Sequence, residues 1–151
     1  MSLSDLPESL ISVISGIQRL VRRKLRPGVT GPRLSGAQVE LLRLVAATPG
    51  IGVSAAAKEL YLAGNSVSTM VNQLTAAGLL HREPGHEDRR SARLLPTPQG
   101  EARLRDWRER RAALVRAHVD RLDETDQQAL AAAVPALRRL ADGLREEVAR
   151  P

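Results

Sequence analysis

The sequence predicts a mainly α-helical (α+β) protein in which one β-hairpin interrupts a series of amphipathic helices. Apolar residues recur at spacings of three and four along much of the 151-residue chain, which is the period of a helix packed on one side. There is no Phe, one Trp and one Tyr, so the core must be built from Leu, Val, Ile and Ala, and such a core favours packed helices over a β-sandwich. Two short segments flanking a polar stretch with a central glycine predict the hairpin.

The composition limits the partners and the chemistry. The formal net charge is +6, which fits binding to phosphate backbones, although an Arg-rich and Ala-rich chain is also typical of a GC-rich genome. Because readers of RNA and single strands stack bases on aromatic rings, the scarcity of aromatics favours duplex DNA as the nucleic-acid partner. The absence of Cys excludes a thiol switch, a Cys-based zinc knuckle and an iron–sulfur cluster. No apolar run approaches the roughly 20 residues of a membrane helix, so we expect a cytoplasmic protein with no membrane partner.

The first part of the chain predicts two helices. Residues 6–26 form the first, and its apolar stripe consists of Leu10, Val13, Ile14, Ile17, Leu20, Val21 and Leu25. Pro27 and Gly28 end this helix. The second helix begins at Ser35, because Ser35 and Gln38 form the S-x-x-Q pattern of a capping box, and it ends before the run 48–50.

The middle of the chain predicts a short strand and two helices joined by a tight turn. Residues 51–53 are the expected strand, and Ser54 is the expected N-cap of a short helix that ends at Leu60. A longer helix follows from Asn65 to about residue 77. Gly78 stands where a left-handed residue ends many helices.

This longer helix carries the residues on which a function depends. Val67, Met70, Val71 and Leu74 share one face. The opposite face carries short, uncharged hydrogen-bonding residues: Asn65, Ser66, Ser68, Thr69 and Asn72. Such side chains suit the major groove of DNA, where base edges offer donors, acceptors and the thymine methyl group. The simpler alternative is a solvated helix face.

The remaining residues predict the hairpin and two long helices. The hairpin strands are expected at 79–83 and 91–95. Thr97 and Pro98 predict a helix start, and the helix runs to about His118 with Leu104, Trp107, Leu114 and Val115 among its packing positions. Asp123 begins the last helix, in which Pro135 should produce a bend and whose apolar stripe is Leu130, Val134, Leu137, Leu140, Leu144 and Val148. One small hairpin and three short helices cannot cover three such stripes, so we expect a two-fold homodimer, with a monomeric bundle as the alternative.

With this order of elements the chain resembles the MarR family of winged-helix transcriptional regulators, most specifically over residues 65–102. The matching motifs are the helix end at Leu74, Ala77, Gly78 and Leu79, the D-x-R of Asp88, Arg89 and Arg90, and the family's L-T-x-x-G, matched by Leu95, Thr97 and Gly100 with Pro96 between the Leu and the Thr. The resemblance implies a winged helix-turn-helix DNA-binding lobe at 35–97. Residues 1–34 and 98–151 then form an N- and C-terminal helical dimerisation lobe.

The resemblance also implies roles for single residues. The five polar residues of the long central helix fall where family members reach bases and adjacent phosphates. Arg90 falls on the arginine that enters the minor groove, Asp88 on the acid that braces it, and Arg89 is the competing residue at the tip. Ser35 and Ser54, at helix N-termini, are candidates for phosphate contacts.

Two positions depart from the family pattern. Ala63 stands where the family often has Ser or Thr, so the start of the reading helix is open and Asn65 is an alternative cap. Tyr61 stands at a turn position that is usually Gly, and we expect its side chain to pack between lobes or to line a pocket.

Arg82, His86 and Arg93 are expected to contact the DNA backbone or to be solvated.

The family function implied is that of a DNA-binding regulator, most often a repressor, relieved by a small phenolic or carboxylate effector. Candidate effector-pocket residues are Gln18, Arg22, Trp107, Arg108 and Arg111. The alternative places Trp107 in the dimer core and leaves the arginines solvated.

Other classes of function have less support. His81, His86 and His118 are scattered and no nucleophile–base spacing is recognisable, so we expect no enzyme activity and no cofactor. A metal site at His81, His86 and Asp88 is a weak alternative, and we expect no bound metal. A winged helix used only for protein contact, without specific DNA binding, is the main alternative function.

Overall fold

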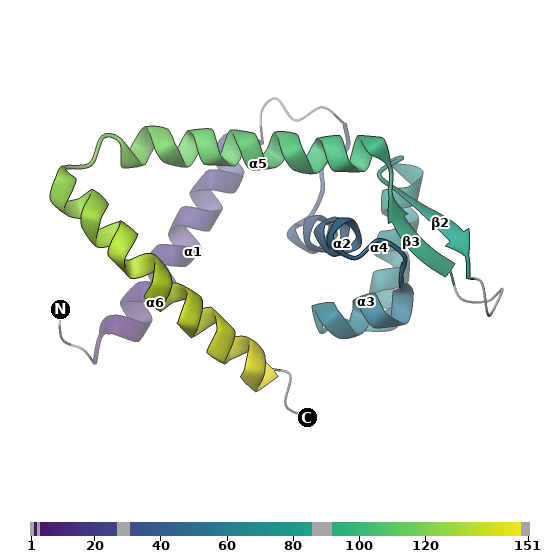
Figure 1. Cartoon of the computed structure of the whole chain (residues 1–151), viewed down its shortest axis with the longest axis horizontal. Coiled ribbons are helices and arrows are strands. Elements are labelled where there is room, and N and C mark those ends of the chain that lie inside the picture. The colour runs from purple at the N-terminus through teal and green to yellow at the C-terminus, as the bar shows by residue number, and fades with distance from the viewer. Residues whose placement is uncertain (1, 3, 27–30, 86–91, 149–151) are drawn as a thin grey trace. The chain divides into compact units, whose positions relative to one another are not determined.

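The computed structural model describes residues 2, 4–26, 31–85 and 92–148. The elements in chain order are α1 (Leu6–Leu25), α2 (Gly36–Ala47), β1 (Ile51–Gly52), α3 (Val53–Leu60), α4 (Gly64–Ala76), β2 (Leu80–Pro84), β3 (Ala92–Pro96), α5 (Pro98–Val119) and α6 (Glu124–Val148) (Figure 1). The predicted fold class and the order of the elements are confirmed. The chain forms two compact units, residues 1–111 and 112–151, and helix α5 contributes to both.

The core of the first unit is aliphatic. It is formed by α2, α3, α4, the sheet and the first turns of α5, and consists of Leu41, Leu42, Val45, Ala56, Ala57, Val67, Val71, Leu74, Leu79, Leu80, Leu94 and Leu104. As the composition predicts, no aromatic side chain belongs to this cluster. Full burial of one Leu or Val stabilises the fold by about 1.5–3 kcal/mol. The lobe that carries α4 therefore has a core of its own.

The three strands form an antiparallel sheet in the order β1-β3-β2. Leu80 pairs with Pro96 and Pro84 pairs with Ala92 across the hairpin. β2 begins one residue later than predicted, because the amide of Leu79 still bonds the carbonyl of Leu74 (2.9 Å) and so belongs to the end of α4. β3 is described from Ala92, and the predicted first residue of this strand, Ser91, lies outside the described residues. Gly78 has φ +74°, the left-handed conformation that the sequence predicts there.

Helix α2 begins with the predicted capping box. The Ser35 hydroxyl accepts from the Gln38 amide (3.2 Å), and the Gln38 side chain accepts from the Ser35 amide (2.8 Å). The predicted cap of α3 is wrong, because Gly52 and not Ser54 is its N-cap. Gly52 pairs with Arg93 in the sheet and has ψ 162°, so the chain passes from strand to helix without an intervening residue.

The turn between α3 and α4 also corrects two expectations. Ala63 is the N-cap of α4 and supplies no side-chain bond, so the alternative that Asn65 caps the helix is wrong. Tyr61 takes the left-handed conformation (φ 53°, ψ 40°) that glycine usually provides. Its side chain is 57% exposed, so the expected packing of Tyr61 is wrong for the single chain. The turn conformation, not a packing role, accounts for this position.

The start of α5 locks the winged lobe to the long helix. Thr97 donates its hydroxyl to the carbonyl of Gly78 (2.6 Å) and accepts from the amide of Gly100 (3.0 Å), which confirms the predicted helix start. Gly100 is buried, and a Cβ placed there would collide with the carbonyl oxygen of Leu79. The L-T-x-x-G motif is therefore a packing requirement of this junction.

The second unit is dominated by α6. Asp123 accepts from the amide of Asp126 (2.8 Å) as predicted, and the helix continues through Pro135. No residue of α6 is buried, and the exposed apolar residues on it are Leu130, Val134, Leu137, Leu140, Leu144 and Val148. None of the described helices is both long enough and apolar enough to cross a membrane.

Candidate nucleic-acid interface

Helix α4 separates its buried and exposed faces as the helical period requires. Val67, Val71 and Leu74 have no exposed surface. Of the five polar candidates, Ser68 is partly buried at the flank of the helix, and Asn65, Ser66, Thr69 and Asn72 are exposed on its outer side. The structure therefore brings the predicted reading residues to the surface side of one helix. Its apolar side holds that helix in the core.

Local hydrogen bonds distinguish these five side chains. The Asn65 carbonyl oxygen Oδ1 accepts from the backbone amide of Ser66 (2.8 Å), and the Thr69 hydroxyl donates to the backbone carbonyl of Asn65 (3.0 Å). Both groups thus help to satisfy the first turns of a helix that has no side-chain cap. The hydroxyls of Ser66 and Ser68 make no hydrogen bond within the part of the chain that the structure describes. Ser66, which is also exposed, has the greatest freedom to meet a base edge.

Two side-chain bonds connect α4 to its neighbours, and the sequence gives no signal for either. Asn72 accepts from Nη2 of Arg82 on β2 (2.8 Å), which links the helix to the hairpin. Gln38 donates from Nε2 to Gln73 (2.7 Å) while its Oε1 remains in the capping box of α2. Such pairs are separated in sequence by 10 and 35 residues, so only the folded structure brings them together.

The helix N-termini offer backbone amides. Gly36 and Ala37 follow Ser35, the N-cap of α2, and Ser54 lies in the first turn of α3. In the first turn of both helices the backbone amides have no hydrogen-bond acceptor within the helix. Ser35 and Ser54 are both exposed. Amides of this kind are suited to bind phosphate oxygens.

The hairpin tip lies outside the described residues. It contains His86 and the predicted groove residues Asp88, Arg89 and Arg90, whose roles stay predictions. On the described strands, Arg82 is exposed, whereas Arg93 is partly buried against Gly50, where an added Cβ would collide with its guanidinium. Arg93 therefore packs on the turn before β1.

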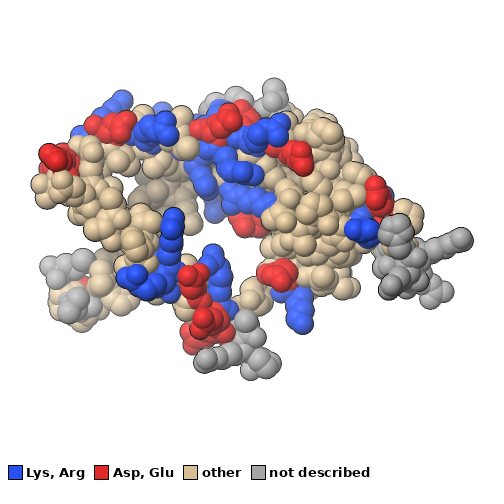
Figure 2. Space-filling view, in the orientation of Figure 1, with Lys and Arg blue, Asp and Glu red and all other residues tan. Residues whose placement is uncertain are grey.

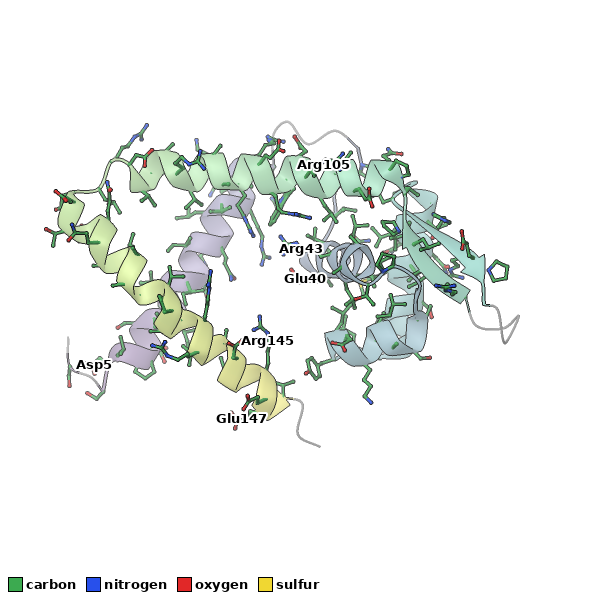
Figure 3. All side chains as sticks on the ribbon, in the orientation of Figure 1. Asp5, Glu40, Arg43, Arg105, Arg145 and Glu147 are labelled. Carbon is green, nitrogen blue, oxygen red and sulfur yellow. The ribbon has the colours of Figure 1, made fainter. Side chains whose placement is uncertain are left out.

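A second candidate site surrounds Trp107. The guanidinium carbons of Arg43 and Arg111 each lie 4.6 Å from the centre of its ring. Arg43 also pairs with Glu40 on α2 (2.8 Å) (Figure 3). A cavity of about 350 Å³ beside this stack is lined by Arg43, Ala46, Ala47, Arg108 and Arg111. Sequence analysis missed Arg43, because nothing in its neighbourhood in the chain indicates a contact with α5.

The electrostatics of this cavity favour an anion. Burial lowers the pKa of Arg111, and the adjacent charge of Arg43 lowers it further, with Glu40 acting in the opposite direction. Burial is the largest cause of this shift, and the positive charges of Arg43 and Arg108 add to it, so a bound anion would offset only the smaller, electrostatic part. In the space-filling view, basic side chains gather beside α5 (Figure 2).

The predicted effector residues fall in two places. Arg108 and Arg111 line the cavity beside Trp107, whereas Gln18 and Arg22 line a separate hollow of about 670 Å³ along α1. The other residues of that hollow are Ser15, Arg19, Arg23 and Arg26. The five residues do not form one lining in this structure.

The histidines of the metal alternative are not gathered in the described part of the chain. There, no group of three His, Asp or Glu side chains is arranged to hold a metal ion. Nε2 of His81 lies 3.4 Å from Oε1 of Glu83, which is two residues further along the same strand. His86 and Asp88 lie outside the described residues.

Comparison with known proteins shows what this geometry is similar to. Residues 34–91 match the profile of the MarR family. No curated protein sequence matches the chain. FabT from Streptococcus pneumoniae, solved in complex with DNA, shares the fold with 22% sequence identity and a TM-score of 0.74, over 95% of this chain and 99% of that one. The transcription regulator MepR from Staphylococcus aureus shares it with 18% identity and a TM-score of 0.73, over 95% of this chain and 99% of that one. PcaV from Streptomyces coelicolor, solved in complex with its natural ligand, shares it with 21% identity and a TM-score of 0.63, over 94% of this chain and 96% of that one. The family profile covers the helix-turn-helix and the first hairpin strand, and the likeness of fold extends over nearly the whole chain, so the chain is similar to MarR family proteins over residues 34–91 and shares their fold.

Proposed function

We propose that the protein is a homodimeric, sequence-specific regulator that binds double-stranded DNA in the cytoplasm and represses transcription. The observation that carries the proposal is the exposed polar face of α4, set on a helix whose opposite face is fully buried. A rigid helix with short donors and acceptors is suited to the major groove. The DNA complex of FabT, which has the same fold, supports this use of the fold.

Reading is assigned to the first half of α4, because the N-terminal residues of a recognition helix contact base edges. Ser66 and Thr69 are exposed there. Each good bidentate contact to a base contributes about 1–3 kcal/mol of discrimination. The amides at the starts of α2 and α3, next to Ser35 and Ser54, bind phosphates, and Arg90 braced by Asp88 enters the minor groove.

A second copy of the chain is the proposed partner of the terminal helices. Residues on α1 such as Ile11 and Leu20 are each 63% exposed, and Leu144 on α6 is 55% exposed. Stripes of this kind on two helices are covered when chain ends interlock around a two-fold axis. The dimer then sets two recognition helices about 10 base pairs apart on a pseudo-palindromic operator.

The cavity beside Trp107 is the proposed effector site. Arg43, Arg108 and Arg111 supply charge for a small carboxylate or phenolate, and the natural-ligand complex of PcaV supports a ligand in this fold. The effector relieves repression only if it binds two arrangements of the recognition helices with unequal affinity. The distance between those helices is the property that it changes.

A mobility shift tests the DNA-binding proposal. The probe is the DNA upstream of the protein's own gene, with unrelated DNA as competitor, at low and moderate salt. We expect a complex that survives competition at moderate salt, followed by a symmetric footprint. Loss of selectivity at every salt concentration would instead favour a winged helix used for protein contact.

Arg90→Ala separates wing binding from base reading. We expect it to weaken binding about equally for all sequences of similar groove width, because an arginine in the minor groove reads shape more than base identity. Ser66→Ala is the matched change on α4 and should alter preference among operator variants. Wild-type affinity of Arg90→Ala across salt concentrations would refute the role of the wing arginine.

A further inference from the structure

We propose that Arg82 binds a DNA phosphate at the junction of helix α4 and the hairpin, and that Asn72 positions it instead of reading a base. The inference rests on the proposed DNA binding. It changes the role of Asn72, which sequence analysis placed among the base readers. It also selects contact with the DNA backbone over plain solvation, the two expectations for Arg82.

The sheet register places Arg82 against the recognition helix. Arg82 pairs with Leu94, and it shares a strand face with Leu80, since alternate residues of a strand point the same way. Leu80 and Leu94 belong to the core beneath α4. Arg82 therefore emerges at the edge of that core, where its Nη2 donates to Asn72 (2.8 Å).

The hydrogen bond uses one of the two lone pairs of the acceptor that base reading needs, and it fixes the direction of that acceptor. An Asn recognises adenine with its carbonyl oxygen and its amide nitrogen together. Oδ1 of Asn72 already accepts from Arg82. In addition, Asn72 lies about 12 Å along the axis from the first residue of α4, beyond the N-terminal residues that enter the groove. Position and bonding both argue against base reading by Asn72.

Arg82 keeps the means to bind an anion. A guanidinium has five N–H donors, and Asn72 takes one of them. The neighbouring acid, Glu83, points to the other strand face, where it meets His81. Among the described residues Arg82 has no ion-pair partner. An exposed arginine held by a neutral side chain is available to pair with a phosphate.

The experiment measures operator affinity against salt concentration for Arg82→Gln, Arg82→Ala, Asn72→Ala and the double Ala variant. Arg82→Gln keeps a donor for Asn72 but removes the charge. It should weaken binding about tenfold and lower the slope of log affinity against log salt by about 0.9 for each phosphate that is no longer bound. Arg105→Ala, which removes the same charge from an exposed site on α5 (Figure 3), is the control and should leave affinity within about twofold.

The role of Asn72 is tested by coupling and by base preference. Asn72→Ala should weaken binding a few-fold in the wild-type background and have no further effect in the Arg82→Ala background. Its ranking of operators with single base changes should equal that of wild type. Thermal unfolding of each variant confirms that the fold is intact, and Arg82→Gln serves if Arg82→Ala is unstable.

Two results would overturn the inference. One is wild-type affinity and salt slope for both Arg82 variants. The other is a changed base preference at one operator position in Asn72→Ala, which would restore Asn72 as a reader. Absence of any selective complex with the wild-type protein would overturn the proposed function itself, and it is detected before any variant is compared.

Discussion

The winged lobe and helix α6 use similar aliphatic residues with opposite results. In the lobe, Leu41, Leu74 and Leu94 have no exposed surface. On α6, Leu140 and Leu144 are 47% and 55% exposed, and no residue of that helix is buried. The lobe buries its apolar side chains against other residues of the same chain. Helix α6 has a regular stripe and no cover for it among the described residues of the same chain.

The difference teaches that a hydrophobic stripe reports an interface, not its location. Folding of the lobe depends on contacts within one chain, so its stability should not depend on protein concentration. If α6 is covered by a second copy, the stability of the terminal helices is linked to protomer concentration by mass action. Changes at Leu74 and Leu140 distinguish these two kinds of packing, and smaller effects at Arg43 and Tyr61 then sharpen the account of the first unit.

Leu74→Ala should destabilise the lobe by about 3 kcal/mol, because it removes a fully buried side chain and leaves a cavity. The measurement is urea unfolding at several protein concentrations, with the free energy of unfolding extrapolated to water. Leu140→Ala is the matched change on α6. Equal losses from the two variants at low protein concentration would contradict the distinction between the regions.

Leu140→Asp should weaken dimerisation about 100-fold, roughly 2.8 kcal/mol, because it places a charge in an apolar stripe that a partner covers. Sedimentation equilibrium measures the association constant directly. The variant should keep the circular dichroism of the folded lobe, since Leu140 lies outside the core of that lobe. A monomeric wild-type protein at micromolar concentration would remove the basis of the prediction.

Arg43→Gln should lower the free energy of unfolding by about 0.5–1 kcal/mol, because it removes a cation–π interaction with Trp107. Trp107 is the one tryptophan, so its fluorescence reports the change without a label. Arg105→Gln is the control on an exposed face. We also expect weaker binding of aromatic carboxylates by Arg43→Gln, and unchanged titrations with such acids would contradict the effector site.

Sequence predicted most of the fold because its signals are local. The capping box at Ser35, the left-handed Gly78 and the helix start at Thr97 each depend on residues within a few positions, and all three are confirmed. The Ser54 cap is wrong because strand pairing of Gly52 sets where α3 begins. Long-range contacts were beyond local patterns.

The candidate site divides in the same way. The polar face of α4 follows from helical spacing alone, and the structure places it at the surface. The bond from Arg82 to Asn72 and the stacking of Arg43 on Trp107 depend on how distant elements meet. Periodicity identifies which residues share a face. It does not tell which side chains on that face are already bonded to a neighbour.

A change in stability as small as that of Arg43→Gln, but of opposite sign, is expected at Tyr61, which has φ 53° in the turn before α4. Tyr61→Gly should stabilise the lobe by about 0.5–1 kcal/mol, because Gly adopts the left-handed region without steric cost and the side chain that it removes is mostly exposed. Tyr61→Ala removes the same ring but keeps the Cβ, so it should give no gain. Urea unfolding of the two variants isolates the backbone contribution, and equal stabilities for Gly and Ala would show that the turn is not strained. This turn sets where α4 begins, so the operator affinity of Tyr61→Gly should be measured as well. If Tyr61→Gly is more stable than wild type but binds the operator equally well, the strain at Tyr61 affects the folding of the lobe and not the position of α4.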